Sequence, residues 1–397
     1  MKKITTYLSP NGKQTTIDEY PVSRILIGTL EGVATLEREK ENGPWVLTKR
    51  SLSNCHVGAL VFEPRSKKLF AGGHDNGGLW VSDDGEGGKW RQLKKGLDKT
   101  HIYGMAARCI SDRVSLFVGT KPAGLYRSDD LGENWSEITS IYDVPNTEKW
   151  TFPPPPHMAG VKQIVFHPTE PDTLYVLVEQ GAFLKSNDDG KTWLELKSYS
   201  HPKDASYRDM HRLIIKPNSP EHFVLATGVG IYRSLDAGKS FEQLTKRGER
   251  LGYPDFVFLD PSDENVIFAG GSELNPRAWY DNGIANSCVM KSPDGGKSWI
   301  QLKEGLPEPM VGAIGAMAQH LWPGGMLLLA GTATGEVYAS EDKGQKWEKI
   351  AQQLRPICKE DHYKAFLSEK VRREVVAERV KLSPSYADAR RFELGKV

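Results

Sequence analysis

Four histidines mark the first places to look for chemistry in this chain of 397 residues, which contains ten in all. Each precedes or begins a short run that is typical of a β-strand: His56, His101, His157 and His211. Imidazoles that converge from separate strands can hold one divalent metal ion with an open coordination position, as in a metal-dependent hydrolase or oxidoreductase. No His-x-His or His-x-x-x-His spacing accompanies them, so the alternative that they only bond neighbouring loops stays open.

A second set of residues in the same segments indicates acid/base chemistry without a metal. A lyase that removes a proton next to a carboxylate needs a base beside a cation, whereas a glycoside hydrolase needs two carboxylates. The catalytic candidates are His56, His211, Tyr253, Arg212 and Asp255. The carboxylate pair would come from Asp209, Asp255, Glu179 and Glu273. Both reactions imply a small anionic or sugar-like substrate, bound by Tyr103, Lys121, Lys162, Glu179, Arg208, Arg277 and Trp279.

A repeated turn positions these residues. Its pattern is Ser-x-Asp-x-Gly-x-x-aromatic, and copies begin at Ser128, Ser186, Ser234, Ser292 and Ser340. Ser and Asp side chains accept hydrogen bonds from the backbone of their own turn, Gly permits a tight conformation, and the aromatic side chain returns to the core. The residues predicted to be structural are Ser128, Asp130, Gly132, Trp135, Asp188, Trp193, Asp236, Asp294, Trp299, Asp342 and Trp347.

This turn resembles the Asp-box, or BNR repeat, of the sialidase-like β-propeller superfamily. The resemblance implies that each box joins the third and fourth strands of a blade and lies away from the active site. It does not select an activity, because the superfamily includes sialidases, other glycan-active hydrolases and lyases, sorting receptors and a photosystem assembly factor. Sialidase itself fits poorly, because the Tyr/Phe-Arg-Ile-Pro motif of that family is represented only by Ser23-Arg24-Ile25-Leu26.

Four short strands per repeat predict an all-β fold: a seven-bladed β-propeller of four-stranded antiparallel blades with Asp-box turns, plus a short C-terminal helix. A single domain would span 1–397. The expected blades are approximately 22–50, 56–97, 101–141, 157–198, 208–245, 252–303 and 310–350, followed by a C-terminal helix and a ring-closing strand in 353–397.

The first expected blade has only three strands, so a terminal segment must supply its innermost strand. Glu378–Pro384 in the tail is the first choice, and Ile4–Pro10 is the competing donor. Between the last blade and that tail strand, Asp361–Val380 is charged and lacks Gly and Pro, which predicts a helix outside the ring.

Propeller connectivity brings most of the candidate residues to one end of the channel. Loops that lead into innermost strands share this end with loops that join second and third strands, and two long insertions, 142–160 and 272–287, belong to these classes. We therefore expect a polar cavity lined by His, Arg and Tyr at this end. The alternative is a binding or assembly scaffold without chemistry, which should show a filled channel and an exposed apolar patch.

Composition narrows the function classes further. Fifty-two basic and 51 acidic residues leave a net charge of +1, so no global field favours nucleic acid or an anionic membrane. The four cysteines include no Cys-x-x-Cys pair, and no run approaches ~18 apolar residues. We expect a cytoplasmic protein that binds neither nucleic acid nor membrane, with at most one divalent metal ion as cofactor, while the oligomeric state is left open.

Overall fold

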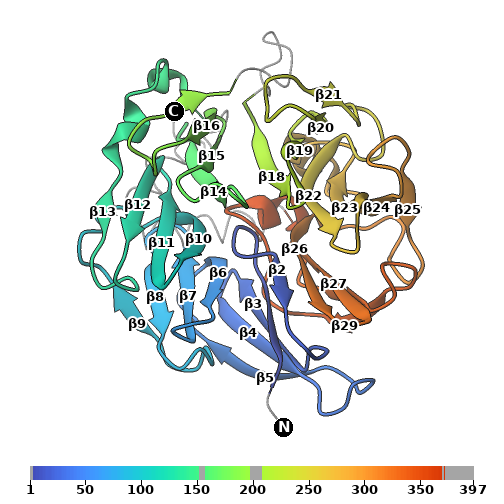
Figure 1. Cartoon of the computed structure of the whole chain (residues 1–397). Coiled ribbons are helices and arrows are strands. Elements are labelled where there is room, and N and C mark those ends of the chain that lie inside the picture. Colours follow the sequence, from blue (N-terminus) through green and yellow to red (C-terminus); the bar gives the residue numbers. More distant parts are fainter. Residues whose placement is uncertain (1–2, 152–156, 197–207, 369–370, 372–397) are drawn as a thin grey trace.

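Seven β-sheets radiate as blades around a central channel in the computed structural model, which describes residues 3–151, 157–196, 208–368 and 371 (Figure 1). The predicted all-β, seven-bladed propeller is confirmed. Among the described residues, no helix is long and apolar enough to cross a bilayer. In ring order the strands are β1 (Thr5–Leu8), β3 (Arg24–Thr29), β4 (Gly32–Glu37) and β5 (Val46–Ser51); β6 (Val57–Glu63), β7 (Lys68–Gly73), β8 (Gly78–Ser82) and β9 (Arg91–Leu93); β10 (Ile102–Ile110), β11 (Arg113–Thr120), β12 (Gly124–Ser128) and β13 (Ser136–Glu137); β14 (Gly160–Phe166), β15 (Leu174–Glu179), β16 (Ala182–Ser186) and β17 (Leu194–Glu195); β18 (Met210–Lys216), β19 (Ser219–Thr227), β20 (Gly230–Ser234) and β21 (Glu242–Gln243); β22 (Tyr253–Asp260), β23 (Asp263–Ser272), β24 (Cys288–Ser292) and β25 (Ile300–Leu302); and β2 (Thr15–Ile17), β26 (Ile314–Trp322), β27 (Gly325–Thr332), β28 (Val337–Ser340) and β29 (Glu348–Ala351).

The N-terminal segment closes the ring. Strand β1 is the innermost strand of the first blade and pairs with β3 in parallel, with Thr5 opposite Arg24. Strand β2 then adds in parallel to β26 of the last blade. The prediction that Glu378–Pro384 fills the innermost place is therefore wrong, although those residues lie outside the described part. One chain end thus binds both the first and the last blade and leaves neither inner edge unpaired.

Helical structure is sparse in the described residues. The 3₁₀ turns are η1 (Thr139–Tyr142), η2 (Thr147–Lys149) and η3 (His362–Phe366), and the α-helix α1 (Pro276–Asn282) lies between β23 and β24. Asn275 caps α1 through its side chain, and Gly283 ends it with a φ of 68°. Most of the helix predicted over Asp361–Val380 lies outside the described residues; its start is η3, which lies at the channel mouth rather than outside the ring (Figure 1).

The repeated turns contain their own hydrogen bonds. In the copy at Ser128, the hydroxyl donates to Asp130 Oδ1 at 2.7 Å and accepts from Gly132 N at 2.9 Å. Gly132 has a φ of 90°, and Trp135 is 5% exposed. The carboxylate of Asp130 also accepts from the backbone of Asn134. These contacts account for the box residues as turn-forming groups, remote from the channel.

Candidate active site

A β-bulge recurs near the start of the innermost strand in six of the seven blades. At each bulge the pairing skips one residue, and the skipped residues are Gly58, Tyr103, Lys162, His211, Asp255 and Gly315. Bulges re-aim side chains and are frequent beside active sites. The same irregularity therefore brings four groups able to titrate to one level of the channel.

Glu179 at the end of β15 joins these groups at the channel axis. Its Oε1 accepts from Lys162 Nζ at 2.8 Å, and its Oε2 accepts from the hydroxyl of Tyr103. The carboxylate is 1% exposed. A buried carboxylate requires such partners, because an unpaired charge in the interior is strongly unfavourable.

His211 connects Glu179 with two further carboxylates. Its Nδ1 donates to the carbonyl of Pro254 at 2.6 Å and lies 3.6 Å from Asp255 Oδ1. Its Nε2 lies 3.2 Å from Asp209 Oδ1 and 4.0 Å from Glu179 Oε1. The bond to Pro254 fixes the ring orientation, so Nε2 faces the acids whichever protonation state the ring adopts.

Residues 356–366, which we call the closing segment, cover this cluster. They follow the last blade and cross the centre of the ring, where η3 lies (Figure 1). Lys359 Nζ reaches Glu179 Oε1 at 2.6 Å and Asp255 Oδ1 at 3.3 Å. Glu360 accepts from Lys121 at 2.6 Å, and the carbonyl of Cys358 lies 2.9 Å from His56 Nε2. The segment therefore completes the ionic network and closes the mouth.

The network keeps its carboxylates ionised. Burial favours the neutral acid, but Lys359 above all, together with Lys162, outweighs it and holds the pKa of Asp255 well below its usual range. For Glu179, burial is likewise opposed by Lys162 and Lys359, and its pKa is far below normal. Burial also raises the pKa of Tyr103 and of Tyr253 well above 10, so both phenols stay neutral. In this closed state neither Glu179 nor Asp255 carries a proton to donate.

The structure brings most of the predicted site residues together, including Tyr103, Lys162, Glu179, His211, Arg212, Tyr253 and Asp255. Lys121 and His56 bond the closing segment, and Trp279 packs its ring against Tyr253 and His362. Arg277 is exposed on α1, and Arg208 bonds Gly181 O and Glu195 at one side. Sequence reasoning missed Lys359, Glu360 and His362, because no repeat links the tail to the blades.

The four-histidine metal site is wrong as predicted. His157 is exposed and has a φ of 58°. The rings of His56 and His101 are each tilted against the ring of His74, with centroids 4.6 Å from His74 for His56 and 4.9 Å for His101. Within the described residues, the metal-ligating atoms that do converge are those of Glu179, Asp209 and His211, all within 4.8 Å of one another. Two ammonium groups already occupy Glu179 Oε1, so this set does not fit a metal ion while the closing segment is in place.

Within the described residues, the closing segment lies where the open cavity was predicted. Beneath the closing segment lies a cavity of about 10 Å³, bordered by Asn11, Arg212, Asp255, Lys359 and His362. That volume corresponds to roughly one water molecule. A cavity of about 790 Å³ lies instead toward the other end of the innermost strands.

The burial of His362 should make the free energy of unfolding dependent on pH. Burial and the charge of Lys359 lower its pKa from 6.5 to about 4, so the folded protein holds this ring neutral while the unfolded chain binds a proton. Stability contributed by His362 is therefore present above pH 6.5 and is lost as pH falls toward 4. The free energy of unfolding should fall between pH 7 and pH 4.5, and it should fall by about 2 kcal/mol less in His362→Gln than in the parent. Urea titration at the two pH values gives the measurement. An equal decrease in unfolding free energy for the parent and the variant would contradict this.

Comparison with known proteins finds xyloglucanases. A xyloglucanase of Acetivibrio thermocellus is 26% identical over 251 residues, which is 57% of this chain and 28% of the relative. An oligoxyloglucan-reducing end-specific xyloglucanase of Emericella nidulans is 24% identical over 247 residues, which is 57% of this chain and 29% of that protein. The chain thus spans less than a third of the length of these relatives. No family model matches it.

A solved structure supports the fold. The crystal structure of an ancestral GH74 enzyme aligns with a TM-score of 0.57 and 16% identity, and covers 74% of this chain and 38% of that one. At this identity the likeness concerns the propeller architecture alone.

Proposed function

We propose that this protein is a hydrolase that acts on a carbohydrate-like substrate at the channel mouth. The observation that carries the proposal is the convergence of Tyr103, Lys162, His211 and Asp255, each placed by the same bulge in its own blade, on Glu179. Buried ion pairs seldom stabilise a fold more than apolar residues would, so a dense buried cluster of titratable groups favours a functional role. The named relatives are xyloglucanases, which favours hydrolysis over the lyase reaction.

Opening of the closing segment would create the acid that hydrolysis needs. In the closed state Lys359 neutralises both Glu179 and Asp255. With Lys359 withdrawn, the two carboxylates share Lys162 as their nearest cation, so the pKa of one of them rises. A protonated carboxylic acid could then protonate the leaving oxygen while an ionised carboxylate activates water, which is the division of roles in glycoside hydrolysis.

A turnover assay tests the proposal. Xyloglucan oligosaccharides and aryl glycosides would be screened with the parent, with Glu179→Gln and with Asp255→Asn. We expect both variants to lose at least about 100-fold in kcat/KM while remaining folded by circular dichroism. Glu195→Gln serves as the matched control, because Glu195 contacts only the peripheral Arg208 among the ion pairs of the described residues and should keep full activity. Undiminished turnover by Asp255→Asn would overturn the assignment.

A scaffold without chemistry is the second candidate. The observation that favours it is the filled mouth, where Lys359 and Lys121 pair with acids from the channel and from the closing segment itself. Under this alternative the ionic cluster only attaches the tail to the ring. The parent would then hydrolyse none of the screened saccharides, even after variants that release the closing segment.

A further inference from the structure

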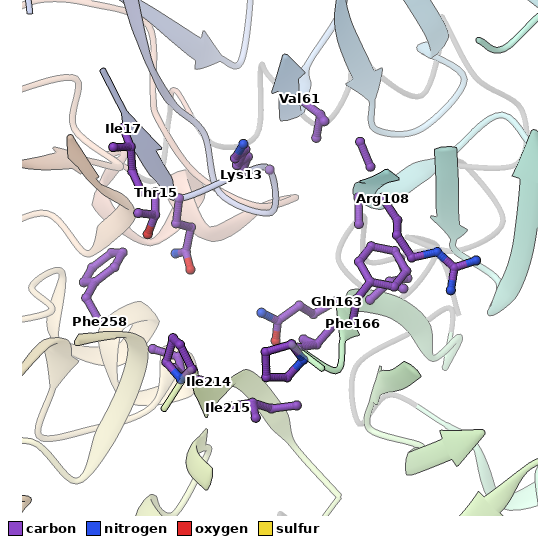
Figure 2. Close-up of a pocket in the computed structure, with 18 of the residues that line it drawn as sticks. Lys13, Thr15, Ile17, Val61, Arg108, Gln163, Phe166, Ile214, Ile215 and Phe258 are labelled. Carbon is purple, nitrogen blue, oxygen red and sulfur yellow. The ribbon is translucent and has the colours of Figure 1, made fainter. Parts of the chain in front are cut away.

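The lower part of the channel contains a second, much larger cavity. The cavity of about 790 Å³, which we call the lower funnel, opens where Pro64, Pro168, Pro217 and Pro261 follow the innermost strands. Its volume falls within the ~300–1,000 Å³ that is usual for small-molecule sites. Figure 2 shows side chains from β2, β6, β10, β14, β18 and β22 around the open space. The closing segment contributes no residue to this lining.

The N-terminal segment forms the inner end of the lower funnel. Asn11 N donates to Gly58 O at 2.8 Å, and Gln319 N donates to Gln14 O at 2.8 Å, so residues 10–14 bridge β6 and β26. Arg212 extends from β18 on another side of the channel and donates from Nη2 to Pro10 O at 2.8 Å. Asn11 and Arg212 therefore lie between the lower funnel and the small cavity beneath the closing segment, and they border both.

Polar groups at this inner end lack partners. Both the nitrogen and the oxygen of the Asn11 amide are buried without a hydrogen bond, and the residue is 3% exposed. Arg212 is 2% exposed, and its Nε is buried without a partner. None of the ion pairs within 4.0 Å in the described part of the chain involves Arg212. The charges of Asp255 and Glu179 act on it from farther away, and its guanidinium lies 5.5 Å from the Phe256 ring. Burying a cation and an amide in this way is costly unless something binds to them.

The walls of the lower funnel are mainly apolar. Gln163 presents an amide there, but both ends of that amide already bond the backbone of Leu213, at 2.7 and 3.2 Å. The guanidinium of Arg108 points away from the open space and binds Asp189 at 2.6 Å (Figure 2). Apolar lining residues include Val61, Ile164, Phe166, Ile214, Ile215, Phe258 and Leu259. A ligand that fits must combine an apolar body with a compact acceptor head.

We propose that the lower funnel binds a small monocarboxylate with a hydrocarbon or aromatic body. Its carboxylate would bind Arg212 and the Asn11 amide nitrogen, and its body would contact the apolar walls. At the inner end a single guanidinium matches one negative charge. The other cations of the lining face acids of their own: Glu63 acts on Lys13, Asp112 binds Arg65 and Asp189 binds Arg108. The walls offer too few free hydrogen-bonding groups for a saccharide, so this site differs in ligand class from the mouth.

A fluorescence titration with 11-(dansylamino)undecanoic acid tests this proposal. We expect saturable binding that dodecanoate displaces and dodecanol displaces at least about tenfold less well. Ile214→Glu puts a negative charge into the half-buried wall and should weaken binding at least about tenfold. Ile17→Glu is the matched control, because Ile17 is 76% exposed at the rim, and it should change binding less than about twofold.

Two further variants separate head-group recognition from folding. Arg212→Met should abolish the preference for the acid over the alcohol, and Asn11→Leu provides the same test if the arginine variant does not fold. A bulky maleimide on Cys109, which is exposed and lines the cavity, should weaken binding in the parent and leave Cys109→Ser unaffected. Equal displacement by acid and alcohol in the parent, or undiminished binding by Ile214→Glu, would overturn the proposal.

Discussion

Lys359→Met is expected to lower the free energy of unfolding by about 3–5 kcal/mol, because removing one member of a buried ionic network leaves its partners uncompensated. Lys359 is 5% exposed and reaches Glu179 and Asp255 at 2.6 and 3.3 Å. Methionine is of similar length and apolar, so the cost arises mainly from charge rather than from a cavity. Urea titration at pH 7 gives the measurement.

Acidification should reduce this loss. In the variant, the folded-state pKa values of Glu179 and Asp255 rise because a major cation is gone. Because protonation of these carboxyl groups stabilises the folded variant, the difference in unfolding free energy between parent and variant should shrink as the pH falls from 7 to 5. Asp255→Asn in the Lys359→Met background should restore part of the stability, giving a coupling energy in a double-mutant cycle.

An ion pair with an exposed lysine supplies the control, and its buried partner Asp260 also accepts hydrogen bonds from Ser262. Lys343 binds Asp260 at 2.7 Å, but its side chain is 45% exposed. Lys343→Met should therefore cost less than about 1 kcal/mol. Equal losses for Lys343→Met and Lys359→Met would show that the closing segment is not held by the central carboxylates.

The blade architecture could be predicted from the sequence because it is local and repeated. Each turn that begins with residues such as Ser186 and Asp188 marks the boundary of a third and a fourth strand, and strand pairing within a blade joins neighbours in sequence. The donor of the ring-closing strand could not be fixed in this way. Ile4–Pro10 and Glu378–Pro384 have similar patterns, and only three-dimensional pairing shows that β1 takes the place.

The candidate site was partly visible in the same repeats. Aligning the innermost strands puts Tyr103, Lys162, His211 and Asp255 in one column, where Gly58 and Gly315 complete the set. A polar residue at one fixed position of an apolar strand is a signal of a bulge facing the channel. The four-histidine prediction rests on position before a strand and not on this register. It therefore includes His157, which is exposed.

The closure of the mouth could not be predicted, because it depends on contacts between residues distant in sequence. Lys359 meets Glu179 across 180 positions, and no local pattern distinguishes a lysine that enters the channel from one on the surface. The glycine at position 315 is one trace of the closing segment in the blades. A Cβ there would lie 1.9 Å from Ile357 O and 2.8 Å from Cys358 Cα, so the bulge of the last blade leaves space for the closing segment.

Gly315→Ala is therefore expected to displace the closing segment while the ring stays folded. The φ of Gly315 is not in the left-handed region, and the atoms nearest to an added Cβ are backbone atoms of Ile357 and Cys358. Cys358 is 1% exposed in the parent, and its release should raise its rate of maleimide labelling at least about tenfold. The measurement uses a Cys109→Ser background, because Cys109 is the exposed cysteine. If the mouth is an active site, hydrolysis should rise in the same variant.

Two buried cysteines and a second glycine variant serve as controls for the labelling of Cys358. Cys55, in the loop before β6, and Cys288, at the start of β24, are buried. Burial raises their thiol pKa to about 12 and about 11, so they should stay unreactive and report an intact ring. Gly312→Ala is the matched variant, because the atoms nearest to its Cβ belong to side chains: Thr334 Oγ1 at 2.1 Å, which can rotate away, and the Cβ atoms of Thr334 and Thr332 at 3.2 and 3.3 Å. Faster labelling of Cys358 in Gly315→Ala alone would identify the closing segment as a separable cover. Slow labelling in both variants would contradict this, and simultaneous labelling of Cys55 and Cys288 would show instead that the segment is part of the cooperative fold.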